Sequence, residues 1–287
     1  MSSAAGNPKR CLNCGALLTG RYCAECSQAA DVHMPSTREL LHEALEGITH
    51  SDSRLWQTLY LLWFKPGKLT QEFAAGRRAA YLPPFRLYLV LSVIFFLVAS
   101  VSPMQAKFVQ LDDPQAKAGA LPRDCAKPNV VLFGRDWSSR LEHVCGEIAR
   151  DNGANLLHLG LATMPKAMFV FLPLIALLHM LLYWRPRHRY AEHLLFFLHV
   201  HAFFFSAMTL AVLSAEAASA WPRLGVLSWI TGLLFWSLPL YTVLAMKRVF
   251  ARSWPGTLLK AAALFVIYQV VLSITLAGVF LYAMLQL

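Results

Sequence analysis

Long apolar blocks follow one another through the part of the chain after residue 84. A helix needs about 20 mostly apolar residues to cross the hydrocarbon of a bilayer, and each block approaches or exceeds that length. The pattern predicts an all-α polytopic membrane protein with five transmembrane helices. These expected helices span about residues 85–103, 164–184, 194–213, 224–246 and 258–285.

The region before these blocks, about residues 35–84, mixes apolar and polar positions with helical spacing. Ser36-Thr-Arg-Glu39 is a capping-box sequence ahead of an amphipathic helix that ends near Ile48. Further helices are expected at about residues 53–64 and 69–81. None is long enough to cross a bilayer, so we expect them to lie along its surface or to pack beneath the membrane domain.

Composition supports the membrane assignment. Apolar residues make up 57% of the chain and charged residues 15%, against about 25% charged in soluble proteins, and the mean hydropathy is +0.47. The formal net charge is +10, but the basic residues lie beside the apolar blocks. Anionic phospholipid and membrane topology account for this placement better than nucleic acid does.

A basic strip precedes the first apolar block and contains a single acidic residue, Glu72. We expect this strip to face lipid headgroups, with a dedicated site for another anionic partner as the alternative. The strip consists of Lys65, Lys68, Arg77, Arg78 and Arg86.

Charges in the short loops between the later blocks predict the topology. The loop between the third and fourth blocks offers only Glu216 and Arg223, whereas the loops on either side of it are basic. Because positive loops stay in the cytosol, we expect a cytosolic N-terminus and an external C-terminus. The basic loops contain Arg185, Arg187 and Arg189 in one case and Lys247, Arg248 and Arg252 in the other.

Residues 1–34 carry the sharpest motif, two Cys-x-x-Cys pairs. Four thiolates at this spacing suit a tetrahedral structural zinc site, and such a site is closed to catalysis. Iron in a rubredoxin-like site is the main alternative. No signal peptide precedes the pairs to favour disulfides, and no βαβ pattern favours a redox motif. The predicted ligands are Cys11, Cys14, Cys23 and Cys26 in a zinc-ribbon or knuckle head, which also indicates a cytosolic location.

The two other cysteines lie in the expected exported loop, residues 105–159. That compartment permits disulfides, so we expect a Cys125–Cys145 bond over the outer ends of the helices, with two free thiols as the alternative.

Ionisable side chains within the apolar blocks are candidate sites because burying them in a membrane is costly. One compact site cannot use them all, since His199 and His201 point to nearly opposite sides of their helix. Hydrogen bonds across helices, a proton or ion pathway, and a metal or haem site all stay open. The candidates are His179, Glu192, His193, His199 and His201.

Three motifs in one order resemble a known family. They are Tyr-Cys23-x-x-Cys26-x-Gln28, Lys65-Pro-Gly ahead of Gly76-Arg-Arg-x-x-Tyr, and Glu192-His-Leu-x-Phe-x-Leu-His-x-His. Together they are similar to bacterial membrane proteins of a domain of unknown function with a zinc-ribbon head. The resemblance implies a bacterial inner-membrane location and a family motif at Glu192–His201. Ser27 departs from it, since such heads often have glycine there.

No catalytic constellation occurs in the sequence, so an enzyme is not expected. The organisation predicted is a head at 1–34, juxtamembrane helices at 35–84 and a membrane domain at 85–287. The first functional hypothesis is an interaction or regulatory protein whose zinc head recruits a cytosolic partner. The alternative is a small transporter or ion or proton channel that uses the membrane histidines.

Overall fold

The computed structural model describes residues 10–30, 53–102, 131–132, 135–136, 138–151, 154–183, 188–221 and 225–286. The amphipathic helix expected at residues 36–48, Cys125 and most of the expected exported loop lie outside these residues, so the corresponding predictions stay predictions.

Among the residues that the structure describes, five helices are long and apolar enough to cross a membrane, which agrees with the number predicted and indicates a multi-pass membrane protein. No other described helix reaches the length required. The five are α4 (Pro84–Val101), α7 (Ala154–Leu182), α8 (Tyr190–Ala220), α9 (Val226–Phe250) and α10 (Trp254–Gln286).

Two of these helices extend well beyond the predicted bounds. Helix α7 begins at Ala154, well before the predicted start near residue 164, and it contains Pro165 and Pro173, which membrane helices tolerate. Helix α8 continues past the apolar block to Ala220, where the hydroxyl groups of Ser214 and Ser219 donate hydrogen bonds to carbonyls of the preceding turn. Polar residues therefore prolong α8 instead of ending it. The earlier start of α7 means that the loop expected at 105–159 ends before Ala154.

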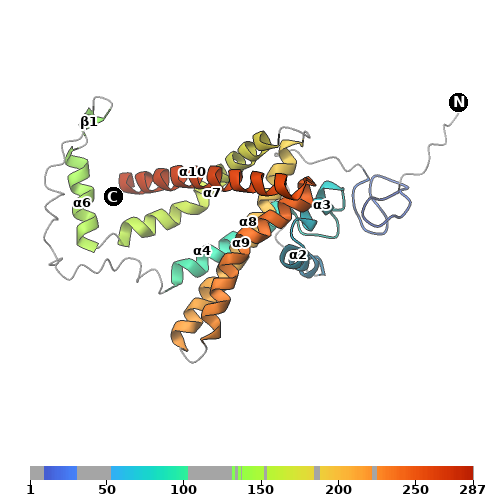
Figure 1. Ribbon diagram of the computed structural model, residues 1–287, viewed down its shortest axis with the longest axis horizontal. Coiled ribbons are helices and arrows are strands. Elements are labelled where there is room, and N and C mark those ends of the chain that lie inside the picture. The colour runs from blue at the N-terminus through green and yellow to red at the C-terminus, as the bar shows by residue number, and fades with distance from the viewer. Residues whose placement is uncertain are drawn as a thin grey trace.

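Helix α8 is the centre of the assembly and the most deeply buried of the five. It packs against α4, α7 and α9, and its apolar residues surround the whole helix, as expected for a fully enclosed element. Phe203 stacks on Tyr241 of α9 with the ring centres 3.7 Å apart. In Figure 1, α8 and α9 run side by side, as do α7 and α10, and the two pairs meet near α3.

The two juxtamembrane helices that the structure describes pack against this meeting point. Helix α2 (Ser53–Phe64) has the predicted bounds, and α3 (Lys68–Ala74) is shorter than predicted. It ends because Gly76 adopts a left-handed conformation, with φ of 84°. The N–H of Gly76 donates to Phe73 and the N–H of Arg77 to Glu72, the pattern of a Schellman motif. The predicted end at Tyr81 was therefore wrong, and Gly76 was the sequence signal for it.

The turn between α2 and α3 lies directly against α9. Gly67 has φ of 74°, and a Cβ atom built on it would lie 2.9 Å from the carbonyl oxygen of Ala245. Arg248 donates from its guanidinium to the carbonyl of Pro66 at 2.6 Å, and the Gln71 amide donates to the carbonyl of Arg248 at 2.8 Å. Arg248 thus has a structural role besides its contribution to the topology signal.

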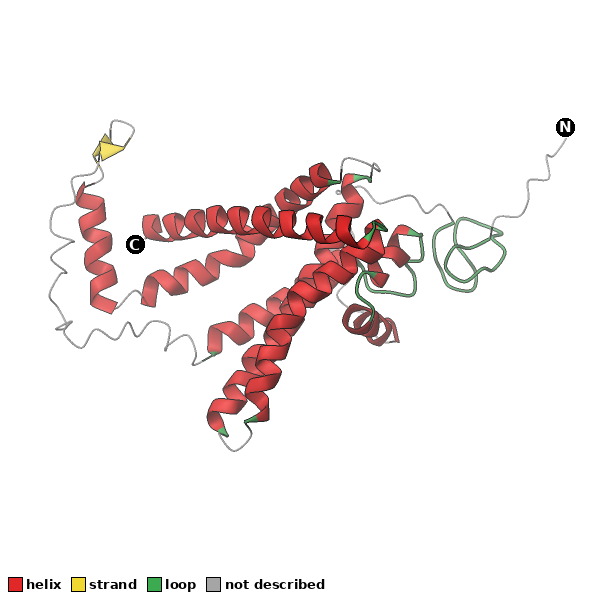
Figure 2. Cartoon of the chain, viewed as in Figure 1, coloured by secondary structure: helices red, strands yellow, loops and turns green. Residues whose placement is uncertain are grey.

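Between α4 and α7 the described residues include structure that the sequence interpretation left as loop. A small hairpin pairs β1 (Val131–Leu132) with β2 (Arg135–Asp136), and apart from it the regular elements of the described residues are helices (Figure 2). Helix α6 (Ser138–Asp151) follows and contacts α7. It lies at the opposite end of the molecule from residues 10–30, and the C-terminal end of α10 lies there too (Figure 1).

Candidate functional site

The first Cys-x-x-Cys pair folds as a tight knuckle. The N–H of Cys11 donates to the carbonyl of Ala16 at 2.8 Å, and the N–H of Gly15 donates back to the carbonyl of Cys11 at 2.9 Å. Gly15 has φ of 79°, a conformation that favours glycine. These bonds turn the chain so that both sulfurs of the pair point to one side.

The second pair repeats this backbone pattern. The N–H of Cys23 donates to the carbonyl of Gln28 at 2.8 Å, and the N–H of Ser27 donates to the carbonyl of Cys23 at 2.9 Å. Ser27 takes φ of 58° and so occupies the left-handed conformation that Gly15 has in the first knuckle. The departure from glycine at this position therefore leaves the shape of the second knuckle unchanged.

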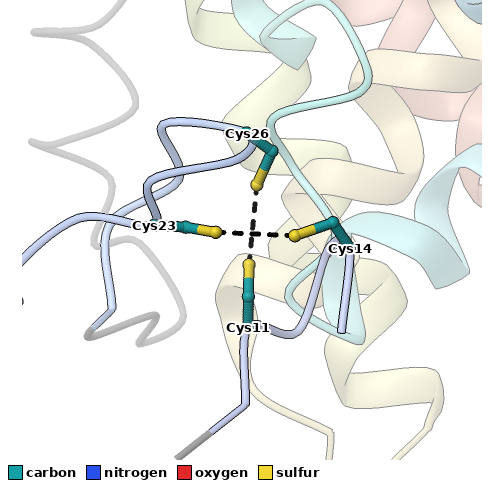
Figure 3. Close-up of side chains that lie close together, drawn as sticks. All are labelled: Cys11, Cys14, Cys23 and Cys26. Carbon is teal, nitrogen blue, oxygen red and sulfur yellow. Dashed lines mark hydrogen bonds between the residues drawn. The ribbon is translucent and has the colours of Figure 1, made fainter. Parts of the chain in front are cut away.

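The four sulfurs converge on one point (Figure 3). The sulfurs of Cys11 and Cys26 lie 3.6 Å apart, those of Cys14 and Cys23 lie 3.5 Å apart, and all four lie within 4.8 Å of one another. Sulfurs at about 2.3 Å from a central metal in a tetrahedron would be about 3.8 Å apart. The four cysteines are thus close enough to hold a metal ion.

The backbone around the first ligand favours the thiolate that a metal requires. Peptide N–H groups of Cys14 and Asn13 hydrogen-bond to the Cys11 sulfur and lower the pKa of this thiol, although burial opposes the shift. The N–H of Ala16 acts in the same way on Cys14, but there the neighbouring Cys23 sulfur and burial outweigh it and raise the pKa. A thiolate, not a thiol, is the form of cysteine that binds metal.

Gln28 connects the four-cysteine head to the helices. Its side chain is buried, and its amide nitrogen donates to the carbonyl of Gly76 at 2.9 Å. Its amide oxygen accepts the N–H groups of Arg78 and Ala79, both at 3.1 Å. One side chain thus satisfies three backbone groups of the turn after α3. Because the backbone carbonyl of Gln28 is bonded to Cys23, the second knuckle determines where this side chain points.

We expect Gln28→Ala to release the head from this turn. The variant leaves three backbone groups without their partner, and one lost hydrogen bond of this kind costs about 0.5–1.5 kcal/mol. Trypsin should then cleave faster after Arg77 or Arg78 in protein purified in detergent. Glu25→Gln is the matched control on the same knuckle because Glu25 is exposed. Trypsin should cleave this variant at the same rate as the wild type. Equal cleavage rates for Gln28→Ala and wild type would contradict the docking role.

Glu72 organises part of the predicted basic strip. Its carboxylate lies 2.8 Å from the ammonium of Lys68 and also pairs with the guanidinium of Arg77. The Arg77 hydrogen bond and then Lys68 lower the pKa of the buried Glu72 carboxyl to about 2, against the opposing effect of burial. Two members of the strip are therefore ion-paired within the protein, while Lys65 is exposed.

Acid should weaken the packing of α3. The folded-state pKa of Glu72 lies below its usual value of 4.5, so its carboxylate adds stability above about pH 4.5 that is lost as the pH falls toward 2. Glu72→Gln should lower the free energy of unfolding at neutral pH by about 1–3 kcal/mol and remove this part of the acid sensitivity. Thermal unfolding in detergent near neutral pH and at pH about 3 measures both effects. A variant as acid-sensitive as the wild type would argue against the pairing.

The five polar candidates of the membrane domain do not form one site. His179 of α7 and His193 of α8 are buried and face each other, with their Nδ1 atoms 2.8 Å apart. Glu192 lies beside them but accepts a hydrogen bond from Nδ1 of His188 at 2.8 Å. Within the described residues, only the four cysteines form a group of three or more ligands close enough for one metal ion.

The other two histidines of α8 contact different helices. Nδ1 of His199 lies 2.9 Å from the hydroxyl of Thr70 in α3. Nδ1 of His201 donates to the carbonyl of Phe197, so its Nε2 accepts from the hydroxyl of Tyr268 in α10 at 3.3 Å. The structure thus shows histidine hydrogen bonds between helices, one of the three possibilities left open by the sequence. The partners Thr70 and Tyr268 gave no sequence signal of their own.

A comparison with protein families matches one segment of the chain, the segment where the head meets the helices. No curated protein and no solved structure matches the chain. The matching segment contains α2, α3 and the first part of α4, including the turn that Gln28 contacts. This agrees with the expected resemblance for that segment only, since the match includes neither the cysteine head nor the histidines. Residues 52–96 are similar to a family described as a protein of unknown function (DUF3667).

Proposed function

We propose that this chain is a regulatory or interaction protein of the membrane whose head binds zinc and recruits a soluble partner. The proposal rests on the four-cysteine head, which contacts the helices through Gln28 and has apolar side chains exposed to solvent. Leu12, Leu17 and Tyr22 are all exposed on a head of about twenty described residues. Exposed apolar groups on so small a unit favour a protein contact.

Zinc is the metal that best suits this cluster. Four thiolates in two knuckles match its preferred tetrahedral sulfur coordination, and its closed ligand set assigns it a structural role. Thiolates and zinc persist in a reducing compartment, and the basic loops on the same side of the membrane also favour the cytosol. We therefore place the head in the cytosol and the C-terminus outside, in the inner membrane of a bacterium.

Photo-crosslinking in cells tests the recruiting role. A photoreactive amino acid at Tyr22 or Leu17 should give a discrete adduct with a soluble protein, and Cys11→Ser should abolish it by unfolding the head. The same amino acid at Trp229, an exposed position on α9, is the control and should give no soluble adduct. The absence of an adduct at both head positions would overturn the proposal.

A transporter or channel is the second candidate. It is favoured by the Nε2 atoms of His179, His193 and His199, which are buried and have no hydrogen-bond partner among the described residues. Unpaired buried atoms of this kind accommodate water or a small solute. Proton or ion flux into vesicles that is lost in His199→Phe, together with unchanged crosslinking at Tyr22, would favour this function over recruitment.

A further inference from the structure

Helix α2 has two apolar faces, and only one of them packs against other described residues. Leu62 is fully buried on the inner face, and Trp63 contacts Phe203 of α8 edge-on with ring centres 5.1 Å apart. On the outer face Trp56, Tyr60 and Phe64 are 74%, 54% and 70% exposed. These three residues recur every four positions and form one aromatic stripe, in which the rings of Tyr60 and Phe64 lie 5.5 Å apart.

A hydrogen bond holds α2 beside the start of α4. The buried hydroxyl of Thr58 accepts the N–H of Leu82 at 3.0 Å, just before α4 begins at Pro84. The exposed large apolar side chains of α4 begin at Val90. Helix α2 therefore lies beside the start of the first long apolar helix, and in a bilayer this would put its aromatic stripe at the level of the headgroups and upper acyl chains.

The charges around the stripe also match this level. The exposed side chains of Arg54 and Lys65 lie at the two ends of α2, and the helix contains no acidic residue. Trp and Tyr concentrate at membrane–water interfaces because their rings are apolar and their N–H or O–H groups stay hydrated. Basic residues beside them are attracted to anionic lipid. At about 18 Å, α2 is too short to cross the bilayer.

From these observations we propose that α2 is an in-plane membrane anchor. Trp56, Tyr60 and Phe64 insert into the boundary between headgroups and acyl chains on the side of the cysteine head, while Arg54 and Lys65 contact anionic headgroups. The inner face of α2 is held by α8 and by the segment before α4. The bilayer thus covers the stripe, and the turn that Gln28 contacts is kept close to the membrane surface.

Depth-dependent fluorescence quenching tests this anchor. The full-length protein carries a fluorescent amino acid in place of Trp56 and is reconstituted into vesicles of zwitterionic and anionic phospholipid. Lipids with a spin label near the headgroup should quench the fluorescence several-fold more than lipids labelled near the chain end. The same amino acid in place of Leu240, an exposed position in the middle of α9, should give the reverse order. In place of Tyr22 on the head, neither lipid should quench.

Each other outcome would overturn the proposal. Quenching only by aqueous iodide would show that the stripe faces water. Protection from both iodide and spin-labelled lipid would show that a protein partner or a second copy of the chain covers it. Strongest quenching from the chain-end label would place α2 inside the hydrocarbon. Because Trp56 lies on the outer face of α2, its replacement leaves the inner face intact.

Discussion

Cys23→Ser should remove the metal from the purified protein and unfold its head. The proposed zinc site loses one of four ligands, and metal binding supplies most of the folding free energy of such a unit, about 10–16 kcal/mol in small zinc domains. Metal analysis should therefore fall from about one zinc per chain to nearly none. The turn after α3 should become as accessible to trypsin as in Gln28→Ala, because Gln28 is positioned by its backbone bond to Cys23.

Cys145→Ser is the matched control for this experiment. Cys145 lies in α6, at the end of the molecule away from the four-cysteine head, so its replacement should leave the zinc content unchanged. Zinc retained at full occupancy in Cys23→Ser would contradict the four-thiol site. Stoichiometric iron in place of zinc would keep the site but change its metal.

Gly67→Ala should destabilise the membrane domain by about 2–5 kcal/mol. The new Cβ atom would lie 2.9 Å from the carbonyl oxygen and 3.0 Å from the Cα of Ala245, both backbone atoms that cannot rotate away. The left-handed φ of 74° adds about 1–2 kcal/mol for a residue other than glycine. The α2–α3 turn must therefore separate from α9, which weakens the bonds of Arg248 to Pro66 and of Gln71 to Arg248.

Thermal unfolding in detergent measures this loss of stability. Gly232→Ala, within α9 itself, is the control because a Cβ atom there meets nothing within 4 Å. Alanine favours helix over glycine by about 1 kcal/mol, so this variant should be unchanged or slightly more stable. Equal stability of Gly67→Ala and wild type would mean that the turn does not contact α9 closely.

Features set by neighbouring residues were predictable from the sequence. Hydrophobic length alone gave the five long helices, and the Cys-x-x-Cys spacing gave a cluster of four sulfurs. Helix α6 could also have been found, since Leu141, Val144, Cys145 and Ile148 recur with helical spacing. It was missed because the charged residues between them resemble those of an exposed loop.

Features set by long-range contacts could not be predicted in this way. Gln28 was visible as part of a motif, but its partners lie 48 to 51 residues away along the chain. Thr70 and His199 are 129 residues apart, and a lone threonine in an amphipathic helix predicts no partner. Which of the membrane histidines meet was not predictable either, because rotation about each helix axis decides which side chains face each other. That rotation follows from packing across α7, α8 and α3.

The length of α8 determines where its histidines lie relative to the lipid. Its 31 residues extend about 46 Å, whereas the hydrocarbon layer is about 30 Å thick. Helix α3 packs against the first half of α8 and contains the ion-paired Glu72, which requires a hydrated setting. The surplus length of α8 therefore projects past the acyl chains on that side. His193 and His199 then belong to a buried protein layer next to the aqueous phase, and not to the part of α8 that the acyl chains surround.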